Sequence, residues 1–273
     1  MVHQKIIIEA GKQDSQYFHD IYIYRELFYI FAWRDISVRY KQTILGIAWA
    51  IIRPVLTMVV FSIVFGKLAK LPSEGNVPYP ILVFAALLPW HFFANALHES
   101  ANSLLTNEKL ITKVYFPRMI IPCSSVIVSF VDFLLAFMIF MGIMVYYRFL
   151  PDIKIVMLPF FISIAFIASL GIGLFVASLN VKYRDFRHVI PFIIQFGLYI
   201  SPVGFSSSII PEKYYIWYSL NPMVGIIDGF RWCILGTPLR WESAALSLAL
   251  SILLFFIGFK NFRRTEDYFA DLI

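Results

Sequence analysis

Long uncharged stretches alternate with short charged ones along the whole chain. Most of the uncharged stretches approach or exceed the roughly 20 apolar residues that a helix needs to cross a bilayer. They lie at about 44–65, 80–98, 119–147, 157–180, 189–204 and 243–260. Between their ends only Arg53 and Asp132 carry a formal charge. The pattern predicts an all-α integral membrane protein with six transmembrane helices.

The basic residues predict the orientation of these spans. An even number of spans places both chain ends on one side, where the tails and the loops after spans two and four carry 15 Lys and Arg, against seven on the other side. The positive-inside rule therefore predicts that both termini are cytoplasmic. The net charge of +6 fits attraction to anionic membrane lipid, so we expect no nucleic-acid partner.

The region before the first span has a different pattern. Residues 1–24 predict a cytoplasmic tail with little regular structure up to Asp20, whereas residues 25–41 have helical spacing. One face of this helix is apolar and mostly aromatic, and it consists of Phe28, Tyr29, Ala32, Trp33, Ile36 and Tyr40. Arg34, Ser37 and Lys41 lie opposite, as in a helix that lies in the plane of the membrane interface. Leu27, Phe31 and Val38 form a second apolar ridge suited to protein contact. This helix is either a simple membrane anchor or part of a gate, and both interpretations remain possible.

Two loops also contain helical segments. Residues 99–118 are polar and helix-compatible up to Pro117. In the longest external segment, 205–241, Asn221-Pro222 and Gly236 bracket about 14 helix-compatible residues. This stretch is too short and too interrupted to cross a bilayer, which predicts a re-entrant or interfacial hairpin at the outer leaflet. We interpret 1–273 as a single membrane domain.

The few ionisable groups inside spans leave several interpretations open. An unpaired Asp132 would cost at least about 3 kcal/mol, so it is protonated, paired or in water. Arg53 lies about 13 Å along its helix from Ile44, and either reaches back to headgroups or faces a cavity. His91 lines a cavity or hydrogen-bonds a neighbouring helix. His98 and Glu99 fit a solvated pair at the end of span two.

Motifs for catalysis and nucleotide binding are absent from the sequence. It has no GxxxxGK[ST] phosphate loop, no HExxH, no Gly-x-Ser-x-Gly and no cysteines at metal spacing. We therefore expect no metal and no cofactor on this chain. A membrane-embedded glycan-modifying enzyme would need converging acid, base or histidine groups, and the sparse ionisable set argues against it. Trp90 and Phe93, beside Pro89, suit contact with sugar rings or with lipid.

Several blocks occur in the same order as in one known family. They are "RDISVRYKQTILGIAWAIIRPVLTMVVFSIVFG" (34–66), "LLPWHFFANALHESANSLLTNEKLITKVYFPRMIIP" (87–122), "FIIQFGLYISPV" (192–203), "LNPMVGIIDGFRW" (220–232) and "RRTEDYFADLI" (263–273). From about Arg25 onward the chain resembles the membrane permease subunit of ABC transporters that export polysaccharides, such as lipid-linked O-antigen, capsule-like glycans and teichoic acids.

The resemblance implies partners and roles. It implies a homodimer in the bacterial cytoplasmic membrane, joined to two copies of an ATPase subunit that binds ATP and Mg. Residues 25–41 would form a gate helix at the cytoplasmic entrance, including Trp33, Arg34, Arg39, Tyr40 and Lys41. Residues 99–118 would form the coupling loop that docks on the ATPase, through Asn107, Glu108, Lys109 and Lys113, with Phe116-Pro117-Arg118 fixing its return. The outer re-entrant segment would include Asn221, Pro222 and Arg231.

The substrate implied by the resemblance is a glycan on a polyprenyl-pyrophosphate carrier. The candidates for the channel are Arg53, Trp90, His91 and Phe93. Glutamine is expected before Pro54 in this family, and the arginine found here suggests a contact with the pyrophosphate. Two alternatives stay open: an exporter of drugs or small lipophilic molecules on the same fold, and the glycan-modifying enzyme.

Overall fold

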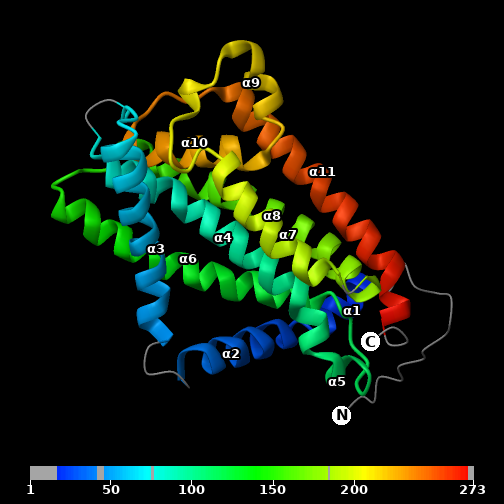
Figure 1. Ribbon diagram of the computed structural model, residues 1–273. Coiled ribbons are helices and arrows are strands. Elements are labelled where there is room, and N and C mark those ends of the chain that lie inside the picture. The colour runs from blue at the N-terminus through cyan, green and yellow to red at the C-terminus, as the bar shows by residue number, and fades with distance from the viewer. Residues whose placement is uncertain (1–16, 42–45, 75–76, 184, 270–273) are drawn as a thin grey trace.

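The structure is a computed structural model that describes residues 17–41, 46–74, 77–183 and 185–269. These residues form helices joined by short connections (Figure 1). The α-helices are α1 (Tyr17–Ile23), α2 (Glu26–Lys41), α3 (Gly46–Phe61), α4 (Tyr79–Thr106), α5 (Glu108–Ile111), α6 (Ile120–Tyr146), α7 (Leu158–Lys182), α8 (Phe186–Ile200), α9 (Glu212–Tyr218), α10 (Pro222–Leu235) and α11 (Trp241–Thr265). The π-helix η1 (Ser62–Leu68) continues α3, and 3₁₀ turns lie at η2 (Ile153–Met157), η3 (Ser207–Ile209) and η4 (Glu266–Tyr268).

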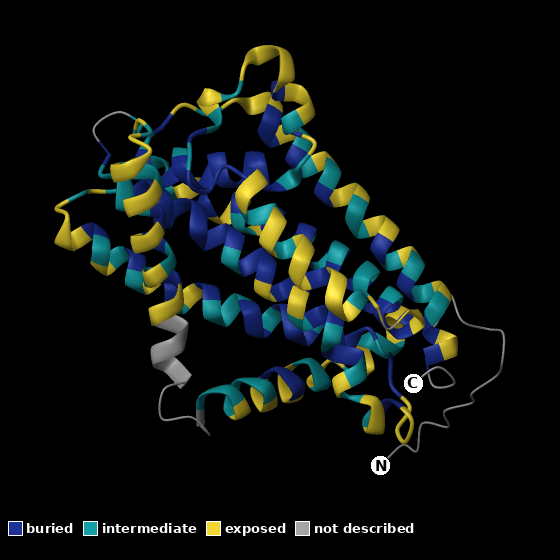
Figure 2. Ribbon diagram, in the orientation of Figure 1, coloured by how far each residue is buried: buried dark blue, intermediate teal, exposed yellow. Residues whose placement is uncertain are grey.

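Four helices among the described residues are long and apolar enough to cross a membrane. They are α4, α6, α7 with the preceding η2, and α11 with the following η4, while α8 is a shorter apolar helix. In the most apolar part of α4, 83% of the residues are buried, against 28% in α11 (Figure 2). Helix α4 therefore forms the centre of the bundle, and α11 lies at its periphery.

Small residues allow the outer helices to approach one another closely. A Cβ atom built on Gly258 of α11 would lie 2.0 Å from the carbonyl oxygen of Gly171 in α7, so the two backbones touch. Asn261 of α11 also donates to the Ser178 hydroxyl of α7 at 2.6 Å. Close backbone approach at glycine is a common way for membrane helices to associate. It joins α11 firmly to α7.

The two ends of the bundle carry different helices. Helices α1, α2 and α5 lie at one end, here called the α2 end, and α9 and α10 lie at the opposite end, here called the α10 end (Figure 1). The helix expected between Asn221 and Gly236 is α10. The Asn221 side chain accepts from the Met223 N–H at 3.0 Å, and Gly236 ends the helix with φ 70°. Both caps follow from local residue preferences.

The segment before residue 25 is more ordered than the sequence suggested. We expected little regular structure up to Asp20, but α1 is a helix from Tyr17, and Tyr17 is buried. The tyrosine ring lies under the Arg263 guanidinium, 3.5 Å from the ring centroid. This contact joins residues far apart in the chain, which local patterns do not reveal. Met1 to Gln16 lie outside the described residues.

Candidate functional site: a charged cavity between α2, α3, α4 and α6

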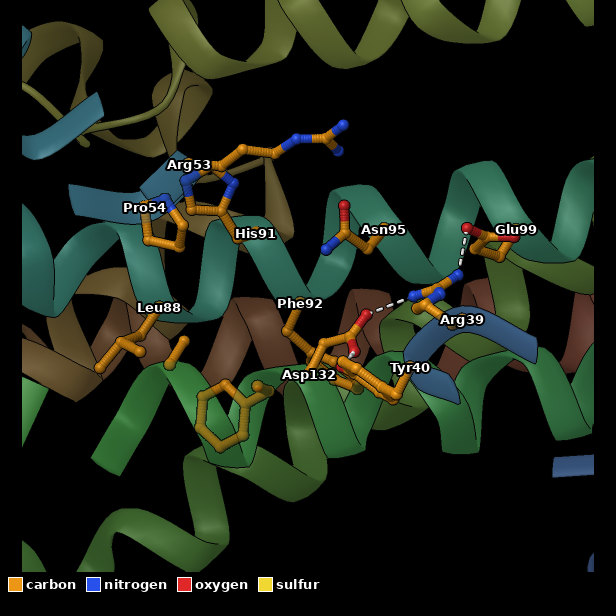
Figure 3. Close-up of a pocket in the computed structure, with 12 residues that line it drawn as sticks. Arg39, Tyr40, Arg53, Pro54, Leu88, His91, Phe92, Asn95, Glu99 and Asp132 are labelled. Carbon is orange, nitrogen blue, oxygen red and sulfur yellow. Dashed lines mark hydrogen bonds and ion pairs between the residues drawn. The ribbon is translucent and has the colours of Figure 1, made fainter. Parts of the chain in front are cut away.

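A cavity of about 380 Å³ lies where α2, α3, α4 and α6 meet (Figure 3). Leu88, Phe92, Phe133 and Ala136 form its apolar wall together with Pro54. Its charged and polar lining consists of Arg39, Tyr40, Arg53, His91, Asn95, Glu99 and Asp132. These groups come from four different helices, so the cavity depends on how the helices pack.

Arg39 of α2 connects three helices at one end of this cavity. Its guanidinium forms ion pairs with Asp132 of α6 and, at 2.5 Å, with Glu99 of α4. The Tyr40 hydroxyl donates a hydrogen bond to the second carboxylate oxygen of Asp132. Asp132 is therefore paired, which settles one of the interpretations left open by the sequence. His98 and Glu99 were expected to be solvated: His98 is exposed, whereas the Glu99 side chain is 41% exposed and binds Arg39.

The network also changes the protonation behaviour of the two α2 side chains. Burial by itself lowers the pKa of Arg39, but the charges of Asp132 and Glu99 outweigh it and raise the pKa above its ordinary value. Burial and the hydrogen bond to Asp132 raise the pKa of Tyr40. At neutral pH α2 is thus held by a charged arginine and a neutral tyrosine.

Three polar residues of α4 line the cavity along one face of that helix. His91, Asn95 and Glu99 follow one another at four-residue spacing, so they share a face of the helix. The Nε2 atom of His91 is buried and has no hydrogen-bond partner among the described residues. Arg53 of α3 lines the same cavity (Figure 3). Asn95 was not among the expected site residues, although its spacing from His91 could have revealed it.

The two aromatic candidates of α4 lie elsewhere. Trp90 and Phe93 are buried in the core and do not line the cavity. A Cβ atom on Gly197 of α8 would lie 2.6 Å from the Trp90 ring, which shows how closely α8 packs there. Exposed aromatic side chains follow α8 at helical spacing instead, namely Phe192, Phe196 and Tyr199. The sequence contained this spacing, but it did not reveal which helix is central.

The expected contact residues of α2 are only partly exposed. Phe31 of the second apolar ridge is buried against Phe116, with ring centroids 5.7 Å apart, so it packs within the chain. Trp33 is exposed and stacks on Tyr29. Arg34 pairs with Asp35 at 2.8 Å. The Lys41 side chain lies outside the described part of the chain.

The loop between α4 and α6 carries the other predicted contacts. Glu108, Lys109 and Lys113 are exposed. Asn107 is half-buried and donates to the Ser103 carbonyl at 2.8 Å. Arg118 is also half-buried, and its backbone N–H donates to Glu266 at 2.6 Å. Arg118 therefore binds the C-terminal part of the chain and is not an open surface group.

The predicted residues of the α10 end all make contacts that hold the local fold together. Asn221 and Pro222 begin α10. Arg231, counted from the sequence among the charges of the external segment, is fully buried. It donates to the carbonyl oxygens of Phe205 at 2.9 Å and Val203 at 3.1 Å. In the part of the chain that the structure describes, no group of three His, Cys, Asp or Glu residues could hold a metal ion.

Residues 26–235 match the profile of a family described as ABC-2 type transporter. The chain is similar along most of its length to several characterised proteins. An O-antigen export system permease protein RfbA of Klebsiella pneumoniae is 26% identical over 242 residues, or 88% of this chain and 92% of that protein. The protein of the same name from Myxococcus xanthus is 26% identical over 258 residues, or 93% and 98%. The polysialic acid transport protein KpsM of Escherichia coli is 21% identical over 243 residues, or 86% and 91%.

Proposed function

Because the chain belongs to the ABC-2 type transporter family, we propose that it is the membrane permease of an ATP-driven polysaccharide exporter. It moves a lipid-linked polysaccharide from the cytoplasmic to the outer side of the cell membrane. The observation that carries this proposal is the similarity, over at least 86% of the chain, to proteins named for O-antigen export and polysialic acid transport.

The energy for export comes from a separate ATPase subunit. The sequence has no phosphate loop, so ATP and Mg belong to that subunit. The proposed assembly is a homodimer of this chain with two ATPase copies, in the bacterial cytoplasmic membrane with both termini in the cytoplasm. Helix α3 with η1, and α8, add two spans to the four long apolar helices.

In this proposal the α2 end is the cytoplasmic entrance. Helix α2 is the gate helix, and the exposed Glu108, Lys109 and Lys113 contact the ATPase. The outer re-entrant segment, which contains α10, closes the exit. The cavity next to α2 supports a role in substrate entry, because it combines the cation Arg53 with the groups His91 and Asn95 and with aromatic walls.

The glycan carrier ends in a pyrophosphate, and Arg53 is the group proposed to meet it. An arginine is always charged and suits phosphate oxygens because its donors lie in a fixed plane. Arg39 is the second arginine on the cavity, and it is already bound to two carboxylates. A pyrophosphate near Arg39 would compete with Asp132 and Glu99, which offers a way for substrate to loosen α2.

The test is a clean deletion, followed by separation of long-chain glycan at the cell surface from glycan in the cytoplasmic membrane. We expect surface glycan to disappear and glycan on its lipid carrier to accumulate inside, and the wild-type gene to reverse both. Surface glycan of normal amount and length would contradict the proposal and favour an exporter of small lipophilic molecules. Altered glycan structure with normal export would favour an enzyme.

A further inference from the structure

The C-terminal block 263–273 has no role in the function proposed so far. Within the described part of this block, Glu266 lies in η4 directly after α11. The side chain is 8% exposed although it is a carboxylate, and such groups are rarely buried without partners. Buried in this way, Glu266 must be held by specific donors.

Three parts of the chain supply those donors. Oxygen Oε1 accepts the backbone N–H of Arg118 at 2.6 Å, and Oε2 accepts the Tyr17 hydroxyl at 2.9 Å. Arg263 adds a longer ion pair at 3.4 Å. The Arg118 guanidinium in turn donates to the backbone carbonyl of Glu266. Arg118 and Glu266 therefore bind one another through both side chains and both backbones.

Arg118 lies at the end of the loop between α4 and α6, so its contact with Glu266 joins this loop to the end of α11. It is the last residue but one before α6, at the point where the loop that carries Glu108, Lys109 and Lys113 returns to the bundle. An apolar cluster lies beside the contact and includes Ile111 and Phe116 of the loop and Phe262 and Phe269 from the C-terminal part. The loop is thus attached to the end of α11 by apolar packing with a charged contact beside it.

We propose that Glu266 is a positioning residue that transmits movement from the 107–118 loop to α11. This rests on the proposed function, in which the ATPase acts on that loop. With the contact intact, a displacement of the loop moves α11 together with α6. Helix α11 then moves α7, because their backbones touch at Gly171 and Gly258. Tyr17 brings α1, and through it the start of α2, into the same unit.

The alternative is that Glu266 only stabilises the fold, and the two roles give different measurements. A stabilising residue changes the amount of complex and leaves the export of each intact complex unchanged. A transmitting residue lowers the export obtained for each ATP hydrolysed. Glu266→Gln keeps the shape and one acceptor oxygen but removes the charge. Tyr17→Phe removes a single donor to Glu266. The matched control is Glu242→Gln, because Glu242 is an exposed glutamate in the first turn of α11.

The experiment complements the deletion strain with each variant and purifies the complex through a tag on the ATPase. Three quantities are measured: copurified permease, ATP hydrolysis, and surface glycan per unit time. We expect Glu266→Gln to copurify and hydrolyse ATP, while export per ATP falls about tenfold, as for the loss of a charge-assisted hydrogen bond. Tyr17→Phe should lower it about threefold, and Glu242→Gln should match the wild type.

Two results would overturn the inference. One is unchanged export per ATP in Glu266→Gln; the other is a loss of export that only follows a loss of copurified permease. If the Glu266→Gln protein does not accumulate, the export per ATP hydrolysed by the Tyr17→Phe complex tests the inference in its place. A wild-type complex that hydrolyses ATP but never brings glycan to the surface would instead contradict polysaccharide export itself.

Discussion

An arginine holds a neighbouring segment at each end of the bundle, but the two arginines use different partners. At the α2 end, Arg39 binds the carboxylates of Asp132 and Glu99, and these three side chains are 32%, 14% and 41% exposed. At the α10 end, Arg231 is 1% exposed and binds the backbone carbonyls of Val203 and Phe205. Tyr79 donates to the carbonyl of Gly204, the residue between them.

The difference bears on which end can move. Partly exposed ion pairs contribute about 0–1 kcal/mol, and water or another anion can replace either partner. A buried carbonyl that loses its donor has no replacement, and each such loss costs roughly 1–3 kcal/mol. The α2 end is therefore suited to repeated release, whereas the α10 end fixes the turn that follows α8.

The largest effect is expected at the α10 end. Arg231→Met fills similar space but leaves the carbonyls of Val203 and Phe205 without their donor. We expect a loss of stability of roughly 2–6 kcal/mol and little mature protein in the membrane. Thermal unfolding of the detergent-purified complex and immunoblotting of membranes measure this. A stable Arg231→Met protein would remove the distinction between the two ends.

The next effect concerns the charge of the cavity at the α2 end. Arg53→Glu places a negative charge where the pyrophosphate is proposed to enter, so export should be abolished while the complex still assembles. Arg53→Gln keeps a polar side chain and should be tolerated. Surface glycan and copurified ATPase are measured for both variants. Equal loss of assembly in both would mean that Arg53 is purely structural.

A moderate effect is expected for the ion pairs of α2 themselves. In a double-mutant cycle of Arg39→Gln and Asp132→Asn, we expect a coupling energy of about 0.5–1 kcal/mol, because both side chains are partly exposed. Chemical or thermal unfolding of the purified complex gives the four values. Glu99→Gln, which alters the more exposed pair, should have the smaller effect. A coupling of several kcal/mol would show that α2 is held as firmly as the α10 end.

The comparison also shows which features a sequence can predict. Helix α10 was predicted within its observed bounds, because Asn221, Pro222 and Gly236 are end signals that act within a few residues. The pairing of Arg39 with Asp132 spans 93 positions, and that of Arg118 with Glu266 spans 148. Such contacts depend on how helices pack, and no local pattern encodes them.

The burial of two aromatic residues of α4 depends on packing in the same way. Trp90 and Phe93 are candidates for the channel, and in the structure both are buried because α4 is the central helix. Hydrophobic periodicity identifies α4 and α8 equally well as apolar helices. It does not say which one the others surround, because both helices are mostly apolar.

The smallest expected effect tests whether the α10 end depends on Arg231 alone. Tyr79→Phe removes one hydroxyl, and with it the hydrogen bond to the Gly204 carbonyl. The ring remains, so its close contact with Gly66 is kept. We expect a loss of about 1 kcal/mol, or about 2–4 °C in Tm, with export nearly normal. A loss as large as that of Arg231→Met would mean that residues 203–205 are held as one cooperative unit, in which each donor depends on the other. A loss near 1 kcal/mol would mean that Arg231 suffices to hold the turn, and that Tyr79 adds an independent bond.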